Sequence, residues 1–130
     1  MRVDIQWRPD IGLATIDYDG AHIDTEPRFE EWKQQVLDGL RAIATERSGR
    51  KFPLVVGIDE LRIVPALSER YGKEMVPVVS QWCEPIARYG TAANVRVIVS
   101  VEAMRGHYSA NIFSDFDDAV RFVLGGEGSD

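Results

Sequence analysis

The sequence has few of the residues that most often carry chemistry in proteins. One cysteine, Cys83, and two histidines occur among 130 residues. A single cysteine excludes an internal disulfide and a zinc site made of cysteines alone. No nucleophile motif accompanied by a base and a glycine-rich oxyanion loop is present either. The sequence therefore indicates a fold class, while an activity has to be inferred from less specific features.

Long apolar runs and clusters of positive charge are also missing. Apolar runs such as 97–99 are too short to cross a membrane, and charged residues stand where a secretory signal needs an apolar segment. We therefore expect a cytoplasmic protein without a membrane span. The balance of 15 basic against 21 acidic residues gives a formal net charge of −6. Because nucleic-acid binding depends on clustered Lys and Arg, we expect no nucleic-acid partner.

What is present is the composition of one globular domain. Hydrophobic residues make up 45% of the chain and charged residues 28%, both ordinary values. We expect a single domain over residues 1–124 and a flexible tail at 125–130, which reads Gly-Gly-Glu-Gly-Ser-Asp.

Hydrophobic periodicity assigns the elements. Alternation of apolar and polar residues predicts a hairpin of two strands. A stripe at steps of three and four residues predicts an amphipathic helix after them, with Thr25 as its cap and Pro27 in its first turn. The elements expected along the chain are strands at 2–9 and 12–20, a helix at 24–44, a strand at 52–59, a helical segment from Pro65 to Gly90 interrupted near Gly72 and Pro77, a buried strand at 94–102, a very short strand at 110–113, and a helix at 114–124 capped by Ser114.

This order predicts an α/β domain with a mixed sheet of four to five strands and helices packed on it. The elements follow as strand, strand, helix, strand, helix, strand, an optional short strand, and helix. Three tryptophans are expected in the core, and Cys83 is expected in the second half of the interrupted helical segment.

Three segments, LVVGIDELRIV (54–64), RYGTAANVRVIVSV (88–101) and IFSDFDDAVRFVL (112–124), resemble the sulphate-transporter and anti-sigma-factor-antagonist (STAS) domains. The likeness is greatest to their STAS-like bacterial relatives. It implies a non-enzymatic regulatory or protein-interaction domain that binds a protein partner or a second copy of itself. A small apolar or anionic ligand is also possible by the same resemblance, and no cofactor is expected.

The resemblance also indicates where such a domain would act. In anti-sigma-factor antagonists a serine at the start of the helix after the third strand is phosphorylated, and Ser68 falls at that place. A phosphate at a helix start meets free amides and a favourable dipole. The alternative is an ordinary polar residue of the first helical turn. The expected partner surface follows the third strand and consists of Asp59, Glu60, Leu61, Arg62 and Val64.

A different class of function remains open, a small enzyme or ligand-binding protein. Its site would combine His107 with a carboxylate, Glu102 or Asp59, at the ends of neighbouring strands, where open α/β sheets usually hold their ligands. Residues 15–26 match part of a calcium-binding loop, but a solvated turn leading to a capped helix explains them as well. We therefore predict no metal site.

Overall fold

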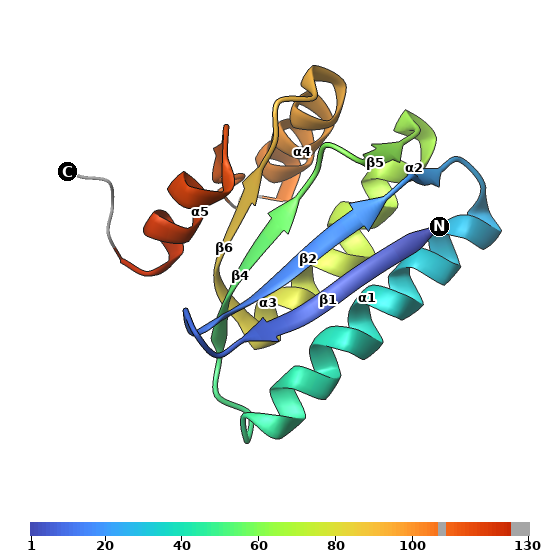
Figure 1. The fold of residues 1–130 in the computed structure, drawn as a ribbon. Helices are drawn as coiled ribbons and strands as arrows, with labels where there is room; N and C mark the ends of the chain where they lie inside the picture. Colours follow the sequence, from blue (N-terminus) through green and yellow to red (C-terminus); the bar gives the residue numbers. More distant parts are fainter. Residues whose placement is uncertain (107–108, 126–130) are drawn as a thin grey trace.

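A computed structural model describes residues 1–106 and 109–125 of the chain (Figure 1). Its elements are β1 (Arg2–Arg8), β2 (Leu13–Asp19), β3 (Ala21–Ile23), α1 (Glu26–Glu46), β4 (Phe52–Gly57), β5 (Leu61–Ile63), α2 (Pro65–Arg70), the π-helical turn η1 (Tyr71–Met75), α3 (Val76–Trp82), β6 (Cys83–Tyr89), α4 (Ala93–Gly106), β7 (Ile112–Phe113) and α5 (Phe116–Val123). None of these helices combines the length and the apolarity that a membrane span requires.

The main sheet has five strands in the order β1-β2-β4-β6-β7. β1 runs antiparallel to β2, whereas β2, β4, β6 and β7 are parallel to one another. β3 and β5 form a separate parallel pair. The predicted α/β class, the mixed sheet and the N-terminal hairpin are confirmed, and the optional short strand exists as β7.

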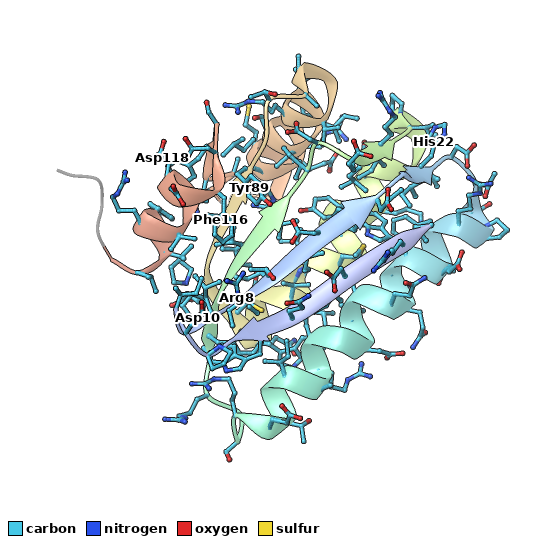
Figure 2. The ribbon with its side chains drawn as sticks, viewed as in Figure 1. Arg8, Asp10, His22, Tyr89, Phe116 and Asp118 are labelled. Atoms are coloured by element: carbon cyan, nitrogen blue, oxygen red, sulfur yellow. The ribbon has the colours of Figure 1, made fainter. Side chains whose placement is uncertain are left out.

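Helices cover both faces of the main sheet (Figure 1). On one face α1 and the segment from α2 to α3 enclose the larger core, in which Phe29 and Trp32 are almost fully buried. On the other face α5 packs Ala119 and Val123 against the sheet. There the ring of Tyr89 meets Phe116 edge-on at 5.5 Å between centroids, and the two lie together in Figure 2. The sheet is therefore the middle layer of the domain.

The prediction of a helix up to Gly90 was wrong, because the helix ends at Trp82 and β6 follows. β6 lies between β4 and β7, so its alternate residues enter different layers: Ile86 packs on the α1 side and Ala87 on the α5 side. Cys83 is the first residue of this strand, and burial raises the pKa of its thiol to about 12. Gly72 also does not end a helix, since the chain continues through η1 into α3.

The prediction of a strand at 94–102 was wrong as well, because these residues belong to α4. Val95 and Val99 lie one helical turn apart and are buried against Ile58. Val97 and Val101 lie one turn apart on the exposed side. Valines at every second position therefore fit a helix here as well as a strand.

The caps of two helices decide where those helices begin. Thr25 caps α1 as predicted, because its side chain accepts a hydrogen bond from the backbone N–H of Arg28. α5 is capped by Asp115, whose Oδ1 accepts from the N–H of Asp118 at 2.9 Å. The predicted cap Ser114 is thus one residue too early. Only Gly125 of the expected tail lies within the described residues.

Candidate functional site

The C-terminal end of β4 meets the start of α4 through one carboxylate. Asp59 Oδ1 accepts hydrogen bonds from the backbone N–H groups of Thr91 at 2.8 Å and Ala92 at 2.9 Å. These two amides lead directly into α4, so Asp59 acts as a cap supplied from another part of the chain. Gly90 makes this approach possible, because its φ is +151° and a Cβ there would come within 2.8 Å of Asp59 Oδ1.

The expected partner surface after β4 is only partly a surface. Asp59, Glu60 and Arg62 are exposed, and Val64 is half-buried. The prediction is wrong for Leu61, because this residue is 4% exposed and belongs to the core. The reason is β5: this short strand pairs with β3, so that Leu61 and Ile63 face inward while Arg62 faces solvent.

Ser68 lies on α2 and is 7% exposed. Its Oγ is 2.9 Å from the carbonyl oxygen of Pro65 and 3.3 Å from Glu102 Oε2, so the hydroxyl has two acceptors within reach. A phosphate on this oxygen would stand beside the buried Glu102 carboxylate, which would repel it. In this conformation Ser68 joins two helices, and its phosphorylation stays a prediction.

Glu102 lies on α4 and not at the end of a strand, which corrects its expected setting. The residue is 3% exposed, and Arg105 donates to its Oε2 at 3.1 Å. It forms the floor of a hollow of about 290 Å³ whose walls come from α2, η1 and the last turn of α4. Glu69, Gly72 and Lys73 line the opposite wall. His107, the proposed companion of Glu102, lies outside the described residues.

A second space lies inside the larger core, between the sheet and the helices. Its volume is about 50 Å³, and its lining is mostly aliphatic. Polar atoms reach it from Tyr18, whose hydroxyl accepts from Trp32 Nε1 at 3.1 Å, and from Tyr71, whose hydroxyl accepts from Arg88 at 2.7 Å. Burial raises the pKa of Tyr18, so this phenol stays protonated. The space suits a few water molecules.

The calcium hypothesis fails on geometry. Residues 15–26 run along β2 and β3 into α1 instead of forming a compact loop. Asp17 accepts a hydrogen bond from the hydroxyl of Tyr89 at 2.8 Å. His22 lies at the other end of the sheet from Asp10 (Figure 2) and is 3.9 Å from Asp24. Across residues 1–106 and 109–125, no three His, Cys, Asp or Glu side chains gather as a metal site would require.

The outward side of α4 is the feature that sequence reasoning missed. Val97, Val101 and Met104 are 61%, 39% and 77% exposed, and their spacing places them on one side of the helix. The available signal was the absence of a polar face in 93–106. Such a helix has apolar residues left over after one face is buried.

Comparisons with protein-family models, with curated proteins and with solved structures return no match to this chain.

Proposed function

We propose that this chain is a non-enzymatic, STAS-like interaction domain that binds a protein through the outward side of α4 and the adjoining turn between β4 and β5. The observation that carries the proposal is the row of Val97, Val101 and Met104, three apolar side chains exposed on consecutive turns of one helix. Apolar side chains gathered on one surface commonly mark a contact with another protein.

The polar residues around this surface support binding more than chemistry. The carboxylate of Asp59 is held by two backbone amides, and the hydroxyl of Ser68 is held between α2 and α4. A catalytic base or nucleophile needs a lone pair or proton directed at a substrate. The STAS-like part of the proposal rests on the three sequence segments quoted above, and the mixed α/β sheet is compatible with it.

Site-specific photo-crosslinking tests the proposal. A benzophenone side chain would replace Val97, and a matched control would carry it at Leu124, an equally apolar residue that is 51% exposed beyond α5. In cells of the source organism, the probe at 97 should give a discrete crosslinked protein band, and the probe at 124 should not. A second substitution, Val101→Asp, should remove that band. Equal labelling from both positions would contradict the proposal.

The hollow above Glu102 favours a second candidate, the binding of a small polar ligand. A buried carboxylate at the floor, with Lys73 and Arg105 on the walls, could hold a molecule bearing both charges. A library of small zwitterions and amines, screened by NMR chemical shifts, tests this candidate. Shifts confined to 69–73 and 102–106 that vanish in Glu102→Gln would support it, whereas shifts unchanged by that substitution would contradict it.

A further inference from the structure

The two sides of α4 differ in their exposure to solvent. The inward side buries Val95, Val99 and Ala103 against the body of the domain. The outward side consists of small and apolar residues that are all exposed: Ala93, Val97, Ser100, Val101 and Met104. Their steps of three and four residues form a straight seam along about 17 Å of helix, the spacing that allows two helices to pack side by side.

The two ends of this seam carry opposite charge. At the N-terminal end lie Asp59, which caps the helix, and the adjacent exposed Glu60. At the C-terminal end lies Arg105, whose side chain is 59% exposed. A helix with acid at one end and base at the other is complementary to a copy of itself placed antiparallel.

The charged residues also share one flank of the helix. On one flank, α4 contacts β5 and α2, and Glu102 reaches Ser68. On the other flank, Arg96 donates to the carbonyl oxygens of Gly90 and Phe113. Arg105 neighbours Glu102, and Glu60 leads into β5, so both lie on the first flank. A two-fold axis brings the same flank of both copies together, because an isologous interface uses one patch twice.

We infer that the occupant of the α4 seam is a second copy of this chain, paired antiparallel about the midpoint between Ser100 and Val101. Val97 of each copy then packs on Met104 of the other, and Arg105 of each copy lies opposite Glu60 of the other. This inference rests on the proposed function, because it names the partner of the same surface. One helix pair buries less than about 1,200 Å² in total, which is the range of weak, transient interfaces.

Sedimentation equilibrium of the full chain at low salt tests the inference with charge-swapped variants. Glu60→Arg and Arg105→Glu, made singly, should each weaken the dimer at least roughly tenfold, because each places like charges opposite one another. The double variant Glu60→Arg/Arg105→Glu should restore it to within about threefold of wild type. Both side chains are exposed, but Arg105→Glu also removes the donor to the buried Glu102, so circular dichroism and urea denaturation check that all three variants fold.

Each outcome separates this inference from the proposed function. Wild-type chain that stays monomeric up to about 1 mM would overturn the dimer. If it still crosslinked to a different protein from residue 97, the proposed function would stand with another partner. A dimer that the single variants leave intact, or that Val101→Asp does not dissociate, would overturn the antiparallel α4 pairing. A dimer restored by the double variant supports it.

Discussion

The two longest helices, α1 and α4, bury their apolar residues in different ways. In α1 the large apolar side chains all pack into the core: Phe29, Trp32 and Leu40 are almost fully buried, and the exposed residues of the helix are nearly all polar. In α4 one set of valines is buried and the next set is exposed. Substituting a buried apolar residue of α1 should therefore change the stability of the fold. Substituting an apolar residue of α4 should change stability on the inward side of the helix and binding on the outward side.

The largest effect is expected from the stripe of α1. Trp32→Ala removes a ring that stacks on Tyr71 at 5.8 Å and whose N–H donates to the hydroxyl of Tyr18. The free energy of unfolding should fall by about 3–5 kcal/mol, measured by urea denaturation. Trp32→Phe keeps most of the volume and should lose less. A loss below about 1 kcal/mol for the alanine variant would show that this stripe does not hold the core.

A matched pair of substitutions sharpens the comparison within α4. Val99→Ala should cost roughly 2 kcal/mol of unfolding free energy, because Val99 is 2% exposed. Val97→Ala should leave the stability unchanged or raise it by about 0.5 kcal/mol, because alanine favours helix and nothing is uncovered. The same urea titration measures both variants. Equal losses would mean that the two sides of α4 are not different.

The cap at the start of α4 should have a smaller effect. Asp59→Ala leaves the amides of Thr91 and Ala92 without their acceptor and should cost about 1 kcal/mol. Hydrogen exchange should speed up in the first turn of α4 and remain unchanged in α1. Asp59→Asn keeps an acceptor and serves as the control. Uniform exchange changes along the chain would contradict a local capping role.

The smallest effect concerns the ion pairs that join α1 to the segment after β5. Arg70 and Lys33 hold the pKa of Glu74 at about 2, below its ordinary value of 4.5. Because the folded-state pKa is the lower one, the stabilising contribution is present above pH 4.5 and is lost as the pH falls toward 2. Across that range, wild type should lose more thermal stability than Glu74→Gln. An equal loss of melting temperature in the two proteins over this pH range would show that these half-buried pairs contribute nothing.

The sequence predicted those elements whose pattern has only one interpretation. The hairpin and α1 with its Thr25 cap follow from alternation, helical spacing and capping chemistry, and β4 follows from a short apolar run with β-branched residues. β6 was predicted as a helix and α4 as a strand, because the contacts that decide between the two lie far apart in the sequence. The residues of β6 alternate between two cores, and the valines of α4 fit both periods.

The contacts of the site residues could not be predicted for the same reason, because they join segments far apart in the sequence. Nothing near Ser68 in the sequence indicates that Glu102, 34 positions away, will reach its hydroxyl. The contact between Asp59 and the amides of Thr91 and Ala92 spans more than 30 positions and is equally invisible. The inward turn of Leu61 depends on pairing with β3, a strand of three residues that the sequence did not reveal.

The most direct test of the role of α4 is dilution of ¹⁵N-labelled wild-type chain, followed by backbone chemical shifts. We predict concentration-dependent shifts along the outward side of α4 and at Glu60, with the outward residues of α1 unchanged. The shifts should disappear in Val101→Asp while the rest of the spectrum stays folded. A spectrum without concentration dependence, or with changes centred on α1, would contradict the account of α4 as the self-associating face.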